Sequence, residues 1–176
     1  MADLLVVTGP PGSGKSTVSA VVVDAFEHAV LVPGDVFFSF WRRGGLPPWL
    51  PDAHAQNTVA TTAAAAAAGS FAGGGWTVVY DGVVGPWFLP LFAAAAGPAD
   101  LHYAVLLPSE ERCVAGVRNR EGHGFTDETA TRSMHREFAS SPLDARHLLV
   151  DPPERPVETA AIVLDRLRAG TLRYRA

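Results

Sequence analysis

Residues 4–17 read LLVVTGPPGSGKST, and the octet Gly9–Ser16 within them fits the phosphate-binding pattern G-x-x-x-x-G-K-[ST] at every fixed position. The apolar run before the octet is typical of a buried parallel strand, and the residues after it are long enough for a helix. Glycines let successive backbone N–H groups turn toward anionic oxygens, and the helix dipole favours the same charge. The stretch therefore predicts a nucleoside triphosphate site.

Lys15 is the only lysine of the chain, and every other basic residue except histidine is an arginine. Its ammonium is a compact point charge suited to polyphosphate, and the hydroxyl of Ser16 is suited to Mg²⁺. A GTPase with an Asn-Lys-x-Asp guanine element is excluded, because no second lysine exists to form one. We expect ATP and Mg²⁺ as cofactors. The expected nucleotide-binding residues of the loop are Gly9, Pro11, Gly12, Ser13, Gly14, Lys15, Ser16 and Thr17.

The composition indicates one globular domain over residues 1–176, because 48% of the residues are hydrophobic and 18% charged. A net charge of −4 provides no general attraction for nucleic acid or an anionic membrane. The apolar stretch 76–97 contains Asp81 and two prolines, which argues against a membrane span. The single cysteine, Cys113, excludes an internal disulfide and fits a reducing compartment. With no room for a signal peptide before the octet, we expect a cytoplasmic protein, monomeric or homodimeric.

Strand-like and helix-like segments alternate along the chain. This alternation predicts an α/β fold of the P-loop NTPase type, with a five-stranded parallel sheet covered by helices on both faces. In such sheets ligands bind at the carboxyl ends of the strands. The predicted strands are 4–8, 29–32, 76–81, 101–107 and 147–150, and the predicted helices are 16–26, 54–71, 86–96, 109–120, 126–140 and 156–169.

Two aspartates follow predicted strands. Asp35 lies twenty residues after Lys15, in a loop expected directly after the second strand. A carboxylate there can orient an acceptor hydroxyl and accept its proton, whereas the alternative is a turn aspartate. Asp81 ends the third strand, where it can hold Mg²⁺ through water, orient the acceptor or cap the next turn.

The chain resembles the small P-loop kinases that include gluconate kinase, shikimate kinase and chloramphenicol phosphotransferase, over nearly its whole length. The resemblance rests on the octet, on Gly34-Asp35 and on residues 118–123, which read RNREGH and look like the Arg-x-Arg-x-Gly-His lid of gluconate kinases. Residues 45–50, GLPPWL, are similar to the Gly-x-Pro and Pro-Trp-Leu elements of that family. The resemblance implies a nucleoside-monophosphate/shikimate kinase-like fold, with a lid near 118–126 and an acceptor-binding region near 35–57.

Arginines near the lid are candidates for phosphate contacts. Arg118 and Arg120 fit mobile cations that close over the phosphates, with a solvated helix end as the alternative. Arg112, earlier on the same predicted helix, is expected at the surface. Arg132 and Arg136 are expected either to face the cleft or to form a solvated stripe. The resemblance also implies that the loop 151–153 passes the adenine ring.

The segment after Asp35 is unusually aromatic for a surface loop, which indicates an acceptor pocket. Gluconate kinases place a histidine two residues after this aspartate, whereas this chain has Phe37, and the difference implies a less polar acceptor than a sugar acid. The expected acceptor-binding residues are Asp35, Phe38, Arg42, Trp49 and Asp81.

Taken together, these residues predict an ATP-dependent phosphotransferase that moves the γ-phosphate to a hydroxyl of a small molecule, a metabolite or an antibiotic. Lys15, Asp35 and Arg120 are the expected catalytic residues, and Ser16 and Asp81 the expected metal ligands. Two alternatives stay open. One is a 5′-kinase of a nucleotide or polynucleotide, and the other is an ATP-binding module without catalysis.

Overall fold

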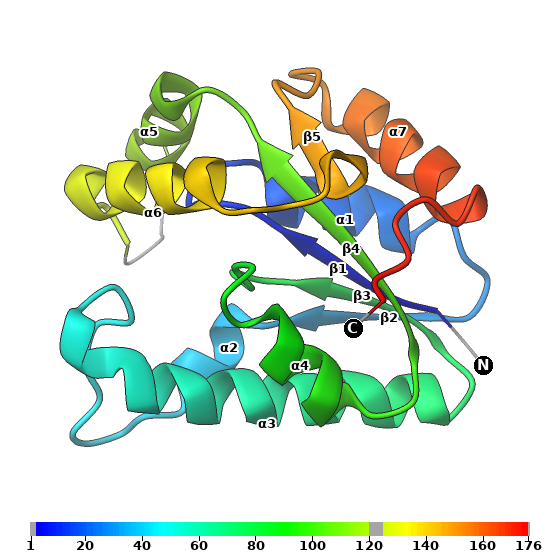
Figure 1. Cartoon of the computed structure of the whole chain (residues 1–176), viewed down its shortest axis with the longest axis horizontal. Coiled ribbons are helices and arrows are strands. Elements are labelled where there is room, and N and C mark those ends of the chain that lie inside the picture. Colours follow the sequence, from blue (N-terminus) through cyan, green and yellow to red (C-terminus); the bar gives the residue numbers. More distant parts are fainter. Residues whose placement is uncertain (1–2, 120–124, 176) are drawn as a thin grey trace.

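The structure, a computed structural model, describes residues 3–119 and 125–175. Its five strands form one parallel sheet in the order β2-β3-β1-β4-β5, so the predicted fold class is confirmed (Figure 1). The strands are β1 Asp3–Thr8, β2 Ala29–Pro33, β3 Thr77–Asp81, β4 Asp100–Leu107 and β5 Leu148–Val150.

Helices cover both faces of the sheet (Figure 1). One face carries α1 and α7, and the other carries α3, α4 and α6, while α5 packs beside α6 beyond the end of β4. The bounds are α1 Lys15–Val23, α2 Asp35–Phe38, α3 His54–Gly73, α4 Leu89–Ala96, α5 Glu110–Arg118, α6 Glu128–Ser140 and α7 Pro156–Arg168, with short 3₁₀ turns at Pro51–Ala53 and Ala145–His147.

The core is divided by the sheet into two apolar layers. Val18 and Val22 of α1 meet Val163 of α7 on one side, and on the other side Phe92 of α4 and Phe138 of α6 are buried against the strands. Helix α3 contributes mostly alanines to the second layer, which lets its backbone approach the strands closely. Because β1 and β4 are buried almost throughout, their sequences show apolar runs rather than alternation.

Two boundaries differ from the sequence prediction for identifiable reasons. Asp35 was expected in a loop, and this was wrong: the residue begins the one-turn helix α2. Helix α6 begins at Glu128 rather than at residue 126, because the side chain of Asp127 caps it by accepting a hydrogen bond from the Ala130 backbone N–H at 2.9 Å. The other helices start or end within a few residues of the predicted limits.

The central strand β1 lies between β3 and β4. Strands β2 and β3 lie on one side of β1, and β4 and β5 lie on the other, so β1 is the point at which the strand order switches sides. Ligand sites of open α/β sheets lie at such a switch point, outside the carboxyl ends of the strands. Hydrogen bonds tie the loops together at this edge. The Gly34 N–H donates to the Asp81 carbonyl at 2.7 Å, and the Val84 N–H donates to the Thr8 hydroxyl at 2.9 Å. Within the described ranges no helix is long and apolar enough to cross a membrane.

Candidate active site

The loop between β1 and α1 has the geometry of a phosphate cradle. Gly14 precedes α1 in a left-handed conformation, and no side chain caps the first N–H groups of the helix. The hydroxyl of Ser13 is buried and has no hydrogen-bond partner among the residues that the structure describes. The amino end of a helix with no capping side chain, together with a buried hydroxyl donor, fits an anionic ligand. The residues present therefore fit the polyphosphate of a nucleotide.

Gly12 fixes this loop against helix α5. Its φ of 78° lies in the left-handed region, and a methyl group at its Cα would overlap the backbone carbonyl of Cys113. Cys113 itself is fully buried, and this burial raises the pKa of its thiol to about 11. The thiol is therefore neutral at physiological pH and serves as a packing group.

The loop residues differ in exposure in a way that suits their expected roles. Lys15 is only 2% exposed, although it is the first residue of α1. Ser16 and Thr17 are exposed beside it, so their hydroxyls are accessible to a ligand. A buried ammonium next to uncapped N–H groups concentrates positive potential at the bottom of the loop.

Asp35 is held at the same edge by close backbone packing. A side chain on Gly34 would overlap the hydroxyl of Tyr80. Glycine is therefore needed directly before Asp35 for the chain to pass this close to Tyr80. Tyr80 is buried, and burial is the main cause that raises its pKa above the usual range, with the charges of Asp35 and Asp81 adding to it. The phenol therefore stays protonated.

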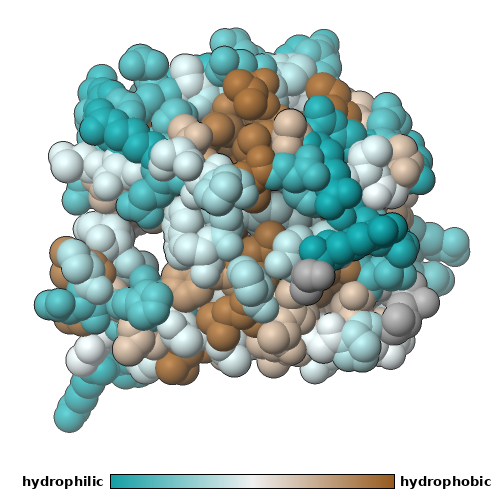
Figure 2. All heavy atoms as spheres, in the orientation of Figure 1, coloured by the Kyte–Doolittle hydropathy of each residue, from teal (hydrophilic) through white to brown (hydrophobic). Residues whose placement is uncertain are grey.

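A cavity of about 710 Å³ opens in front of these groups, large enough for a drug-sized ligand. Lys15 and Asp35 both line it, as does Pro11 of the loop. Its opposite walls come from residues 48–57, which lead into α3, and from α6, and Figure 2 shows the molecule hollowed between these two parts. The structure thus brings the predicted phosphate-binding and acceptor-orienting residues to one space.

Aromatic rings form much of the cavity wall. The rings of Trp49 and Phe125 meet edge to face with centroids 4.7 Å apart, and those of His54 and Phe88 stack at 5.6 Å. Trp87 also lines the cavity and leans on the buried Phe138 at 5.3 Å. Such pairs give a wall that is apolar yet fixed in geometry.

The predicted acceptor-binding residues separate into two groups. Phe38 and Trp49 line the cavity together with Asp35, as expected. Arg42 does not: it is exposed and lies outside the lining, so the structure does not support its assignment. Asp81 ends β3 level with Val7 and Pro33 and is not among the described residues that line the cavity.

The sequence interpretation missed several residues that line the cavity. Residues 86–88 were predicted as the start of a helix, although a position after a strand of a parallel sheet signals a ligand-binding loop. The contribution of α6 had no local signal. Outside the predicted acceptor region 35–57 and the predicted lid 118–126, the missed residues include Thr61, Trp87, Phe88, Met134 and Glu137, whereas His54, Asn57 and Phe125 fall inside those regions without having been singled out.

The predicted lid arginines are only partly described. Arg120 lies outside the described residues. Arg118 ends α5 and pairs with Glu128 of α6 at 2.7 Å, with two thirds of its side chain exposed. Arg112 was expected at the surface, and this was wrong: its guanidinium is partly buried and donates to the Pro152 carbonyl at 2.8 Å. This contact joins α5 to the loop after β5.

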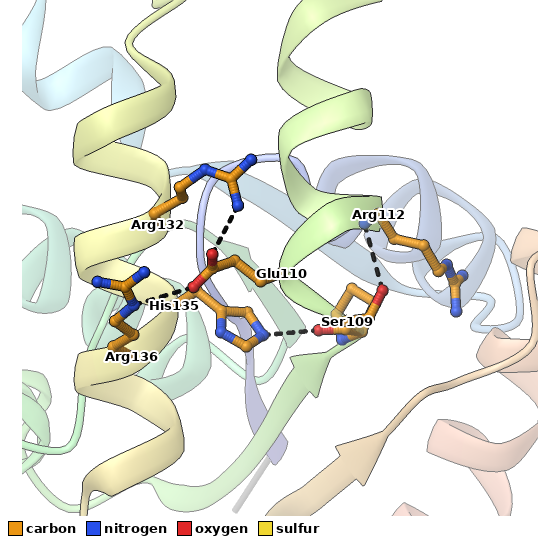
Figure 3. A network of polar contacts seen from close by, with 7 residues as sticks. Ser109, Glu110, Arg112, Arg132, His135 and Arg136 are labelled. Atoms are coloured by element: carbon orange, nitrogen blue, oxygen red, sulfur yellow. Dashed lines mark hydrogen bonds and ion pairs between the residues drawn. The ribbon is translucent and has the colours of Figure 1, made fainter.

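A cluster of charges fastens α6 to α5 (Figure 3). Glu110, in the first turn of α5, accepts hydrogen bonds from Arg132 at 2.6 Å and Arg136 at 3.1 Å. These hydrogen bonds lower the pKa of the Glu110 carboxyl, Arg132 being the larger cause. His135 on the same helix contacts the Pro108 carbonyl at 2.8 Å. The two arginines thus hold one wall of the cavity in place.

Comparison with known proteins agrees with this geometry. A family model described as an AAA domain matches residues 4–141, which include the phosphate loop, the sheet through β4 and helix α6. The chain belongs to this family. A search of curated protein sequences finds no match.

Solved structures of kinases share the fold of this AAA-domain chain. A sugar kinase from Janibacter superposes with a TM-score of 0.69 at 22% identity, covering 99% of this chain and 100% of its own. A gluconokinase from Sinorhizobium meliloti gives 0.64 at 20%, covering 96% and 94%. The Mycobacterium tuberculosis APS kinase CysC, solved in complex with AMPPNP and APS, gives 0.68 at 20%, covering 95% and 98%. The expected small P-loop kinase fold is confirmed.

Proposed function

We propose that this AAA-domain chain is an ATP- and Mg²⁺-dependent kinase that phosphorylates a hydroxyl group of a small molecule. The observation that carries the proposal is the cavity shared by Lys15 and Asp35. A phosphate cradle alone fits any nucleotide-binding protein. A carboxylate across the same space from the cradle is the additional part that transfer to a hydroxyl requires.

The groups divide the reaction between them. The N–H groups of the loop and the Lys15 ammonium bind the β- and γ-phosphates and stabilise the charge that develops during transfer. Asp35 orients the acceptor hydroxyl and takes its proton as the oxygen forms a bond to the γ-phosphorus and the bond to the β–γ bridging oxygen breaks. ADP leaves with that bridging oxygen. Ser16 fits as a ligand of Mg²⁺, which neutralises phosphate charge when bound. We assign Asp81, which ends β3 beside Val7 of β1, as a metal ligand that acts through water.

The single domain 1–176 supplies the rest of the nucleotide site in this proposal. The loop 151–153 and the partly buried Arg112 lie on the side of the cradle formed by α5, where Arg112 holds the Pro152 carbonyl. We assign the adenine ring to this side. The segment 118–126 is assigned as the lid, with Arg118 and Arg120 contributing cations when it closes over the phosphates.

A screen for acceptor-stimulated ADP release tests the proposal. Purified protein with ATP and Mg²⁺ is incubated with single members of a library of hydroxyl compounds, and ADP is measured by a coupled assay. The expected result is stimulation by one structural class, with the phosphorylated compound detected by mass spectrometry. ADP release that no compound stimulates, in a protein that still binds ATP, would mean a non-catalytic module.

The same assay separates small-molecule and polynucleotide kinases. A polynucleotide acceptor binds through its phosphates, so its KM rises steeply with salt. The acidic net charge favours a small molecule, for which we expect a KM that changes little between low and physiological salt. A 5′-hydroxyl oligonucleotide that outcompetes every small compound would overturn this choice.

A further inference from the structure

The cavity has an unequal distribution of charge, and this bears on the acceptor. Among the described residues that line it, Lys15 is the only lysine or arginine, whereas Asp35 and Glu137 both contribute carboxylates. The proposed function, on which this inference rests, assigns Lys15 to the nucleotide phosphates. Once a nucleotide is bound, the remaining charged side chains of the described lining are both negative. An acceptor with a carboxylate or phosphate would therefore meet like charges.

One polar residue of the lining, Asn57, has a hydrogen-bond acceptor without a donor among the described residues. The amide of Asn57 is fixed by its donation to the Pro48 carbonyl at 2.7 Å. Its other atom, Oδ1, is buried and accepts no hydrogen bond from any residue within the described ranges. A buried acceptor without a partner carries a free-energy cost that a ligand donor removes. Together with the two carboxylates it favours a ligand rich in N–H and O–H donors.

The aromatic walls complete the pattern. The faces of Trp49, Trp87 and Phe88 offer apolar area for a ligand body, and the faces of such rings attract cations. Glu137 lies on α6, whose register is fixed by the contacts of Arg132 and Arg136 to Glu110. Within the described residues the Glu137 carboxylate forms no ion pair, and Arg132 and Arg136, which line a second hollow beside it, are both paired with Glu110 instead.

We propose that the acceptor is an amphiphilic amino alcohol. Its hydroxyl lies at Asp35, its apolar body lies between the aromatic walls, and its protonated amine is held by Glu137 at the α6 side of the cavity. The Asn57 amide oxygen accepts a further hydrogen bond from the amine or from a second hydroxyl. The site discriminates against sugar acids and other anionic acceptors by repulsion as much as by lack of attraction.

Binding of three matched compounds tests the charge preference without requiring turnover. Phenylalaninol, its neutral diol analogue and phenyllactate share a phenyl ring and a hydroxyl but carry positive, zero and negative charge. Each is titrated into the protein saturated with AMPPNP and Mg²⁺, and tryptophan fluorescence is followed because Trp49 and Trp87 line the cavity. We expect phenylalaninol to bind about tenfold more tightly than phenyllactate, with the diol between them. Binding by none of the three, or tighter binding of phenyllactate, would overturn the proposal.

A charge reversal assigns the preference to Glu137. In Glu137→Gln the affinity for phenylalaninol falls about threefold, and in Glu137→Arg the order of phenylalaninol and phenyllactate inverts. Glu27→Gln is the matched control, because Glu27 is 91% exposed before the amino end of β2; it should leave all three affinities unchanged. An unchanged order in a folded Glu137→Arg protein would place the charge recognition elsewhere and refute the assignment.

The two proposals fail in different ways. If the amine binds as expected yet no amino alcohol is phosphorylated in the ADP-release assay, the cavity has the proposed selectivity but the kinase function is wrong. If an anionic compound is phosphorylated efficiently, the function stands and the amino-alcohol inference is wrong.

Discussion

The phosphate loop and the acceptor wall face each other across one cavity, but different forces hold them. The loop is fixed by backbone geometry: Gly12 is locked against Cys113, and Lys15 and Ser13 are buried. The acceptor wall consists of side chains, several of them partly exposed to water, such as Trp49, which is 38% exposed. An anion of fixed shape can be recognised by N–H groups, whereas an acceptor of particular shape needs side chains.

The residues of the phosphate loop are contiguous in the sequence, whereas those of the acceptor wall are not. Eight consecutive residues, Gly9–Ser16, carry the loop, so its pattern can be read directly. The acceptor wall is assembled from four separate segments, which are 35–57, 61, 83–88 and 125–137. Such a wall can change its specificity by substitutions in one segment while the loop and the sheet remain intact.

Lys15→Ala should have the largest effect, since it removes the cation on the loop side. No other lysine exists to replace it, and we expect turnover to fall below detection and ATP affinity to weaken in isothermal titration calorimetry. Lys15→Arg should restore little, because the guanidinium is larger and its donors are arranged in a planar fork. Ordinary ATP affinity in Lys15→Ala would refute the assignment of the loop.

Asp35→Asn tests the opposite side of the cavity. The amide keeps the size of the carboxylate but cannot take a proton, so acceptor phosphorylation should fall about 10²-fold while ATP binding stays nearly intact. Ser39→Ala is a suitable control, because Ser39 lines the same cavity and its hydroxyl hydrogen-bonds the Val36 carbonyl of its own turn. If Asp35→Asn keeps turnover within a few-fold of wild type, the base lies elsewhere, and Asp81 is the next candidate.

This contrast explains what sequence reasoning could and could not predict. The sheet, its helices and the loop from Gly9 to Ser16 were accessible, because hydrophobic runs and a contiguous motif specify them locally. Glu137 and Trp87 were not accessible as site residues, since only the tertiary packing of α6 and the loop after β3 brings them to the cavity. Arg112 was placed at the surface because its partner, the Pro152 carbonyl, lies forty residues away and is a backbone atom with no side-chain signal.

Alanine substitutions at two glycines of the loop distinguish backbone strain from steric overlap as causes of destabilisation. Gly12 and Gly14 both have positive φ, 78° and 87°, but only Gly12 has a backbone carbonyl where a methyl group would be placed. Gly14→Ala should cost about 1–2 kcal/mol of unfolding free energy from backbone strain, and Gly12→Ala about 2–4 kcal/mol because overpacking adds to it. Urea denaturation measures both. Equal losses would mean that α5 moves away from the loop freely.

The smallest effect is expected at His147, which ends the 3₁₀ turn Ala145–His147 directly before β5 and is not among the described residues that line the cavity. The His147 ring is buried and must be neutral to make its contacts. Its Nδ1–H donates to the Tyr103 carbonyl at 3.0 Å, while Nε2 accepts from the Arg146 Nε–H at 3.3 Å. Burial is the main cause that lowers the His147 pKa. The Arg146 guanidinium lowers it further, and the Tyr103 carbonyl and Asp144 act in the opposite direction.

The sign of the resulting pH dependence follows from this lowered pKa. Below pH about 6.5 the unfolded chain takes up a proton at this histidine before the folded chain does, so unfolding is favoured as the pH falls. The melting temperature should therefore drop between pH 7.5 and 5.5, and His147→Gln should reduce this dependence of the melting temperature on pH without removing it.

His102, whose pKa burial also lowers, contributes to the same pH dependence. His28→Gln is the control, since 71% of the His28 side chain is exposed and its removal should leave the slope unchanged. Because His147 lies outside the described lining of the cavity, ATP affinity and acceptor affinity at pH 7.5 should be unaffected in His147→Gln. A selective loss of either affinity would show that the turn before β5 is coupled to that side of the cavity.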